Sequence, residues 1–363
     1  MSFTLYNKSG AAKIYWLLSE YSIKVIESDM KDFDYLLKQH LINTVSRMYN
    51  YIFKNYYKYA HCSVAPEWEK DILDDIRGID DDKKNKIWCK LRSATSAHLY
   101  SIIKGKYLCD KGIKQNYRLN SETIEILKNS KMDMIAEIYK DNAGEYFRAV
   151  LEEYSHLPMY EREKYLNISV YSRLNNCISE HDDFSKRRPL KVETDTSHRS
   201  THIIYAYKIM PCKNLNHYYL VAVGKGVHGK KPFTNYILRL THILNAESVY
   251  NYQDGLTADE LKKKSEEIDA LLEKIDVPYI KDEYCDDIKV RFTDDGIKLL
   301  HRVVHNRPLH EEPDENNICI FKCTDREIIN YLHNFGKDAE VLSPTKIREK
   351  LSEFYKHADE CYK

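Results

Sequence analysis

The sequence lacks a long apolar run. Its 363 residues contain no stretch near the length, about 20 apolar residues, that a helix needs to cross a bilayer, which excludes a membrane-spanning protein. The first ten residues also lack the basic head and apolar core of a secretory signal, so we expect a cytoplasmic protein with reduced cysteines. The hydrophobic fraction of 43% and the charged fraction of 31% are typical of a globular chain, and the length predicts two or three domains.

Paired cysteines are missing too. The nine cysteines are scattered without the CxxC spacing of zinc ribbons, and no HExxH motif is present. His301 and His305 lie four apart on a predicted helix, with His310 or Glu311 nearby, and this spacing can chelate zinc. A zinc enzyme is therefore one alternative, whereas the main expectation is a protein without catalytic activity, metal or cofactor.

An excess of one charge is also absent, because 56 basic residues balance 56 acidic ones. The balance hides a segregation. Residues 184–243 carry eleven Lys and Arg against Glu193 and Asp195, an excess of nine positive charges. The compensating acidic residues gather around residues 259–287 and 311–315. A local basic field of this kind favours phosphate-bearing partners whatever the total charge.

Inside the basic segment, Gly224-Lys225-Gly226-Val227-His228-Gly229 has the letters of a dinucleotide-binding fingerprint. That fingerprint requires a helix after the glycines. Here Pro232 and the strand-like run 236–240 follow instead. The stretch is therefore interpreted as a flexible hairpin loop between two antiparallel strands.

The N-terminal part contains a degenerate repeat, about residues 22–60 and 114–157, separated by a helical insert. In both copies a strand precedes two helices: strand 23–26 with helices 28–38 and 44–59, then strand 115–119 with helices 121–128 and 142–157. The stretches "VSRMYNYIFKNYYKY" and "GEYFRAVLEEYSHL" share aromatic and aliphatic positions. We expect the two strands to pair within one chain, because each would otherwise leave an open edge.

These units resemble ribbon-helix-helix domains, in which paired strands enter a DNA groove. Alternation along the second strand places Lys114, Asn116 and Arg118 on one face, and these residue types suit base edges and phosphates. An ordinary surface strand explains the same pattern equally well.

After Pro189 the pattern changes to short strands, at residues 190–194, 201–210, 218–223 and 236–243, which predict a small barrel. Tyr218-Tyr219-Leu220, the run 237–242 and Tyr205-Ala206-Tyr207-Lys208-Ile209 resemble three strands of the WYL domain of bacterial regulators. That resemblance implies an Sm-like or SH3-like barrel that senses a nucleotide or nucleic acid. It also implies a site made of Arg199, Lys208, Tyr219 and Arg239. We add His242, which replaces an arginine of the family pattern, and Lys225, Lys230 and Lys231 of the hairpin loop as further candidates.

The stretch "INYLHNFGKDAEVLSPTKIREKL", residues 329–351, resembles the C-terminal extension that accompanies WYL domains. A ribbon-helix-helix region followed by WYL and this extension is the arrangement of the WYL accessory proteins of type VI-D CRISPR loci, which residues 142–166 also resemble. The resemblance implies binding of single-stranded RNA (or DNA) and enhancement of the RNA-guided RNA nuclease. The load of 30 tyrosines adds the expectation of a homodimer.

The expected fold class is therefore α+β: a helical, ribbon-helix-helix-like region over residues 1–160, a helical connector over 161–188, the barrel over 189–250 and an α/β extension over 251–363. A DNA-binding transcriptional repressor with a ligand-sensing WYL domain is the remaining alternative.

Overall fold

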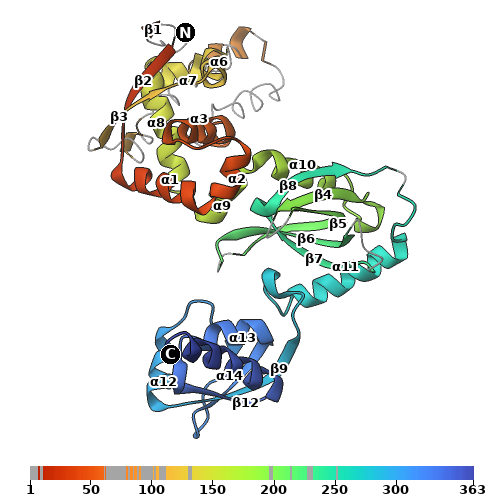
Figure 1. Cartoon of the computed structure of the whole chain (residues 1–363). Coiled ribbons are helices and arrows are strands. Elements are labelled where there is room, and N and C mark those ends of the chain that lie inside the picture. Colours follow the sequence, from red (N-terminus) through yellow and green to blue (C-terminus); the bar gives the residue numbers. More distant parts are fainter. Residues whose placement is uncertain are drawn as a thin grey trace. The chain divides into compact units, whose positions relative to one another are not determined.

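The protein is described by a computed structural model, which covers residues 7–8, 11–60, 62, 79–80, 82–84, 86–87, 90, 101, 104–105, 112–129, 133–195, 199–212, 215–226, 232–250 and 252–363. The chain divides into two compact units, residues 1–169 and 170–363. Both units mix helices with antiparallel strands, which confirms the α+β class (Figure 1).

The N-terminal unit contains a sheet of order β1-β2-β3 covered by helices. Its elements are β1 (Asn7–Lys8), β2 (Ala11–Leu18), α1 (Glu20–Asp32), α2 (Asp34–Gln39), α3 (Val45–Tyr56), β3 (Ile113–Arg118), α6 (Ser121–Lys128), α7 (Asp133–Ile138), α8 (Ala143–Ser155) and α9 (Met159–Leu166). The predicted helical insert lies mostly outside the described residues.

The predicted pairing of residues 23–26 with residues 115–119 is not found, because β3 pairs with β2, which precedes the predicted first repeat. β2 runs antiparallel to β3, with Lys13 opposite Arg118 and Leu18 opposite Ile113. The prediction of a strand at residues 23–26 was wrong, because these residues lie inside α1. The Ser19 side chain caps this helix, and the three-residue spacing of Ile23 and Ile26 places both on its inner face. The paired strands are confirmed as a feature of the chain, whereas their use as a DNA-reading ribbon remains a prediction.

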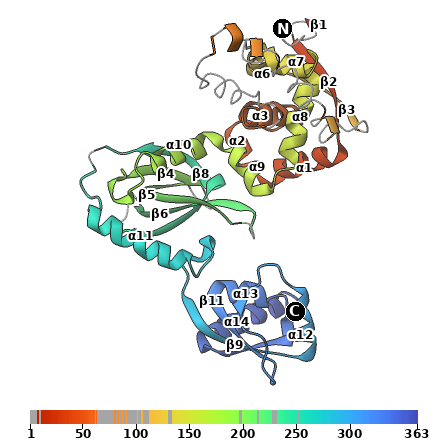
Figure 2. The same cartoon turned by 180° about the vertical axis from the view of Figure 1, so that it is seen from behind.

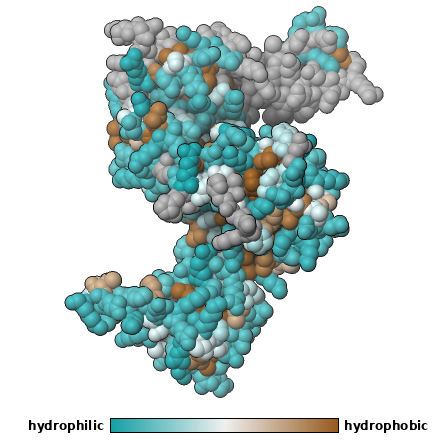
Figure 3. Space-filling model, turned by 45° about the vertical axis from the view of Figure 1, so that its right-hand side comes forward, coloured by the Kyte–Doolittle hydropathy of each residue, from teal (hydrophilic) through white to brown (hydrophobic). Residues whose placement is uncertain are grey.

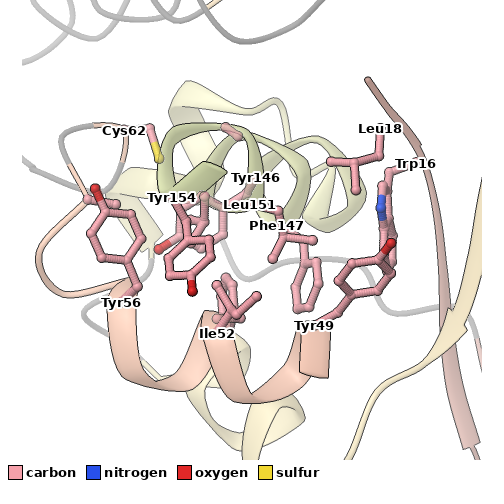
Figure 4. Close-up of a cluster of buried hydrophobic side chains, with 14 of the residues drawn as sticks. Trp16, Leu18, Tyr49, Ile52, Tyr56, Cys62, Tyr146, Phe147, Leu151 and Tyr154 are labelled. Carbon is pink, nitrogen blue, oxygen red and sulfur yellow. The ribbon is translucent and has the colours of Figure 1, made fainter. Parts of the chain in front are cut away.

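An aromatic core joins α3 and α8 to the paired strands (Figure 4). The ring of Phe147 lies 4.6 Å from that of Phe53 and 4.9 Å from that of Trp16. Trp16 comes from β2, so one cluster of tilted, edge-on and stacked rings fixes the strand to α3 and α8. The aromatic and aliphatic positions that the two predicted repeats share in sequence form the helix faces that meet in this core.

The second unit begins with α10 (Ile168–Ser179), which starts two residues before the boundary, and continues with a five-stranded sheet of order β7-β6-β5-β4-β8. The elements are η3 (Phe184–Lys186), β4 (Leu190–Asp195), β5 (Arg199–Cys212), β6 (His217–Gly226), β7 (Thr234–Arg239), η4 (Leu240–His242), β8 (Ile243–Ser248), α11 (Ala258–Leu272) and η5 (Val277–Tyr279). Within the described residues no ladder joins β7 to β8, so a closed barrel is not confirmed. Residues 236–243, expected as one strand, are divided by η4.

The rest of this unit is a four-stranded sheet of order β10-β11-β9-β12 with three helices (Figure 2). Its elements are β9 (Tyr284–Phe292), α12 (Asp294–Arg302), β10 (Leu309–His310), β11 (Ile318–Thr324), α13 (Asp325–Leu332), η6 (Gly336–Asp338), β12 (Ala339–Ser343) and α14 (Thr345–Glu360). This mixture of strands and helices agrees with the α/β extension that the sequence predicts. Two capping boxes, at Thr257 and Thr324, fix where α11 and α13 begin.

No helix in the described part of the chain is long and apolar enough to cross a membrane. On the face drawn in Figure 3, hydrophilic residues cover most of the described surface and hydrophobic residues gather in small groups.

Gly224, the first glycine of the apparent fingerprint, lies in β6 rather than in a phosphate-binding loop. A Cβ at this position would lie 2.5 Å from Cγ2 of Ile204 on β5, so the close packing of the two strands explains the glycine. Gly224→Ala is expected to lower the free energy of unfolding of the second unit by about 1–3 kcal/mol, because the overpacked strand must shift. Chemical denaturation measures the change, with Gly226→Ala as control, since a Cβ there meets nothing within 4 Å. Equal effects of the two changes would contradict this explanation.

Candidate nucleic-acid interface

A cleft of about 580 Å³ opens at one end of the five-stranded sheet. Tyr219 of β6, Arg239 of β7 and His242 of η4 line one side, and all three are predicted site residues. Tyr219 and Arg239 are directly opposite each other across the β6–β7 ladder, so the pleat places both side chains on the same face. All three are half-buried; Tyr219 and Arg239 are held by the sheet and His242 by the short helix η4.

The other side of the cleft comes from the C-terminal extension, which supplies Tyr279, Lys281, Asp282 and Arg326. The Nε of Arg326 lies 2.9 Å from Oδ2 of Asp282, and its guanidinium lies 4.9 Å from the centre of the Tyr279 ring. Arg326 also donates to the carbonyl of Pro278. These contacts hold the guanidinium rigidly at the cleft wall.

The Lys281 residue as a whole is exposed to solvent. Its ammonium group, however, lies 4.5 Å from the centre of the Tyr236 ring. Loss of water around the ammonium lowers the pKa of Lys281 below its ordinary value, and burial raises the pKa of Asp282. Both shifts have the same cause, because each charged group has given up part of its hydration. A charged ligand that enters this cleft therefore meets groups that are already partly dehydrated.

The cleft is suited to an anion with a planar group attached. Arg239, Lys281 and Arg326 bring three positive charges, against the carboxylate of Asp282 among the described lining residues. Tyr219 adds half-buried aromatic surface beside them, whereas the Tyr279 ring is buried under Arg326. Nucleotides combine phosphate charge with a flat base, and proteins that bind single strands use cations and aromatic rings together.

Among the other predicted residues that the structure describes, Arg199, Lys208 and Lys225 do not line this cleft. Arg199 is 70% exposed and pairs with Glu193 at 2.9 Å. Lys208 pairs with Asp269 of α11 at 2.8 Å, and this hydrogen bond raises the pKa of Lys208. Lys225 lies over the rings of Phe233 and Tyr252, at 4.7 Å and 5.6 Å from their centres. Lys230 and Lys231 lie outside the described residues.

The basic and acidic segments of the sequence thus partly neutralise each other in the folded protein. Asp269, from the acidic segment, accepts hydrogen bonds from both Tyr207 and Lys208. Arg187 donates to the backbone carbonyls of His181, Ala206 and Tyr207, which makes it a structural residue. A smaller basic cluster lies in the cleft.

Sequence reasoning missed Lys281, which lies in the stretch 259–287 that was interpreted as acidic, and Arg326, which lies beyond both acidic stretches. One signal was available for Arg326, which lies in the first turn of α13. The helix dipole disfavours a cation there, so another interaction must account for this residue. For Lys281 no comparable signal exists, because only the fold places it beside Tyr236.

On the N-terminal unit, Lys114 and Arg118 are exposed on β3 and Gln115 between them is buried, as the predicted alternation requires. The backbone of Asn116 is described in β3, but its side chain lies outside the description.

The possible zinc pair does not hold the predicted geometry. α12 ends at Arg302, so His301 lies in its last turn and His305 lies beyond the helix. The four-residue spacing therefore does not place the two imidazoles on one helical face. Within the described residues no group of three or more His, Cys, Asp or Glu is arranged to hold a metal ion.

No family model matches the chain, and no curated protein matches it. Among solved structures, one described as a CRISPR Cas-related protein has a TM-score of 0.71 at 19% identity and covers 99% of this chain and 97% of its own. Proteasome accessory factor B/C (PafBC) of Arthrobacter aurescens is a weaker match, with a TM-score of 0.24 and 12% identity over 65% of this chain and 35% of its own. The whole chain therefore shares its fold with the CRISPR Cas-related protein.

Proposed function

We propose that the chain is a CRISPR-associated regulatory protein without catalytic activity of its own. In this proposal it binds single-stranded RNA in the cytoplasm and enhances a type VI-D RNA-guided RNA nuclease. The cleft carries the proposal, because Arg239, Lys281 and Arg326 surround it together with two tyrosines. The fold shared with a CRISPR Cas-related protein over nearly the full length of both chains supports the same role.

The cleft offers cations for phosphates and rings for unpaired bases, whereas a duplex keeps its bases stacked inside. We therefore propose single-stranded RNA as the ligand. The alternative function, a transcriptional repressor, would require duplex DNA instead. Enhancement of the nuclease would then follow from delivering or holding unpaired RNA near the effector.

The direct test compares cleavage of one labelled target RNA by a type VI-D effector with its guide RNA, with and without this protein. The proposal expects faster cleavage in its presence and no cleavage by the protein alone. The Arg239→Gln variant should enhance less than the wild type. Equal cleavage rates with and without the wild-type protein would contradict the proposed enhancement. Cleavage by the protein alone would contradict the proposal that it has no catalytic activity.

We also propose a homodimer, on the ground that the extension carries exposed apolar side chains at Val304, Leu309 and Phe354. Light scattering at micromolar concentration should give about twice the 43.0 kDa of one chain. A mass of one chain at that concentration would contradict this.

A further inference from the structure

The N-terminal unit contains a second cleft, of about 730 Å³, along one side of α3. α3 supplies Arg47 and Lys54 to its lining, and the junction of β3 and α6 supplies Arg118 and Glu122 from the opposite side. Arg47 and Lys54 are seven residues apart, so they lie about 10 Å apart along the helix axis. The cations therefore form a row rather than a single point of charge.

Three features fix the shape of this cleft. The side-chain amide of Asn50 donates to the carbonyl of Arg118 at 3.2 Å and its oxygen accepts from the backbone of Asn120 at 3.1 Å, which holds β3 against α3. Arg47 donates to the carbonyl of Leu41 at 2.8 Å. Lys54 pairs with Glu122 across the cleft at 2.8 Å.

One end of the cleft is aromatic and apolar. The His40 ring packs on Tyr51 with centroids 5.1 Å apart, and the neighbouring Leu41 is 73% exposed. The hydroxyl of Tyr51 donates to the carbonyl of Leu166 at 2.7 Å, so this ring is fixed in position. An exposed apolar and aromatic end beside a row of cations matches what an unpaired nucleotide chain presents, bases on one side and phosphates on the other.

The charges decide which cation is most available. Among the described residues Arg118 has no carboxylate within ion-pairing distance, whereas Lys54 is engaged by Glu122 and Arg47 by backbone. Arg118 is also exposed, at the last position of β3. It can therefore bind a phosphate without first breaking an interaction.

We infer that this second cleft binds the sugar-phosphate backbone of single-stranded RNA, with Arg118 as its main phosphate ligand and the His40–Tyr51 end as a contact for a base. The inference rests on the proposed RNA binding but assigns a site separate from the cleft of Arg239. It also differs from a DNA-reading ribbon, in which the exposed face of β3 would bind along its whole length.

The experiment measures binding of a fluorescein-labelled 20-nucleotide single-stranded RNA to the intact protein by anisotropy at several salt concentrations. Arg118→Gln should weaken binding roughly threefold to tenfold and reduce the slope of log K against log salt by about 0.7, the value for one lost phosphate contact on a single strand. Arg118→Lys should recover most of the affinity. Lys114→Gln is the matched control, since Lys114 is exposed on the same strand and does not line the cleft.

The outcomes separate the two sites. If Arg239→Gln weakens binding while Arg118→Gln leaves affinity and slope unchanged, the second cleft is not a site and the proposed function stands. If Lys114→Gln costs as much as Arg118→Gln, the ribbon face binds and the cleft is rejected. An Arg118 effect that is as large on a duplex of the same sequence also overturns the inference. If the wild-type protein does not bind RNA, both the proposed function and the second binding cleft are contradicted.

Discussion

Arg162→Met is expected to lower the free energy of unfolding of the N-terminal unit by about 3–5 kcal/mol, because it leaves a carboxylate buried without its counter-charge. Asp29 is fully buried, and Arg162 donates to its two oxygens from Nε at 2.8 Å and Nη2 at 2.9 Å. The hydroxyl of Tyr154 donates to the same carboxylate at 2.9 Å. Chemical denaturation of the purified variant measures the loss.

The loss should depend on pH with a definite sign. Burial raises the pKa of Asp29 above its ordinary value even with Arg162 and Tyr154 as partners. A carboxyl group with a raised native pKa makes the free energy of unfolding fall as pH rises between its unfolded and native pKa values. Removing Arg162 raises the native pKa further, so the deficit relative to wild type should grow as the pH rises above the native pKa of Asp29 in the wild type.

Lys164→Met is the matched control in the same helix. Lys164 pairs with Glu161 at 3.4 Å and both side chains are only partly buried, so loss of this pair should cost about 1 kcal/mol, less than loss of the fully buried pair. Adding Asp29→Asn to Arg162→Met should recover part of the stability, since the unpaired charge is gone. If Arg162→Met and Lys164→Met cost the same, the buried pair does not have the role given to it here.

The second large effect is expected at the cleft of the second unit. Arg239→Gln should weaken binding of single-stranded RNA about tenfold to a hundredfold, the range for a lost charge-assisted hydrogen bond. Arg239 lies opposite Tyr219 on the sheet and faces Lys281 and Arg326 across the cleft, so its charge is central to the cluster. Fluorescence anisotropy with the labelled 20-nucleotide RNA measures the change.

Lys208→Gln serves as control, because Lys208 belongs to the same sheet but is paired with Asp269 away from the cleft. It should change affinity less than threefold, and thermal unfolding of both variants should exclude a general loss of structure. A larger effect at Lys208 than at Arg239 would favour the site implied by the sequence resemblance over the site defined by the cleft.

Local patterns in the sequence were sufficient to predict most of the helices and strands, but not which of them pair or pack together. The alternation and turns of residues 190–223 predict β4, β5 and β6. Residues 23–26 were assigned to a strand because Ile-Lys-Val-Ile has high β propensity. Ser19 and the burial of Ile26 show that capping and tertiary packing overrode that propensity.

The candidate site was only half predictable for a related reason. Tyr219, Arg239 and His242 share one short region of the sequence, so a family resemblance could point to them together. Lys281 and Arg326 come from a segment whose overall charge is negative, and pairing of Asp269 with Lys208 is invisible to a count of charges along the chain. Charge in space depends on which residues the fold brings together, and a sequence window does not contain that information.

The most direct test is an equilibrium titration of the intact protein with one labelled 20-nucleotide RNA, single-stranded and as a duplex, at about 150 mM salt. We expect the single strand to bind more tightly than the duplex. The double variant Arg239→Gln/Arg326→Gln should lose most of the single-strand binding while it unfolds at the same temperature as the wild type. Tighter binding of the duplex, or single-strand affinity unchanged in the double variant, would contradict this expectation.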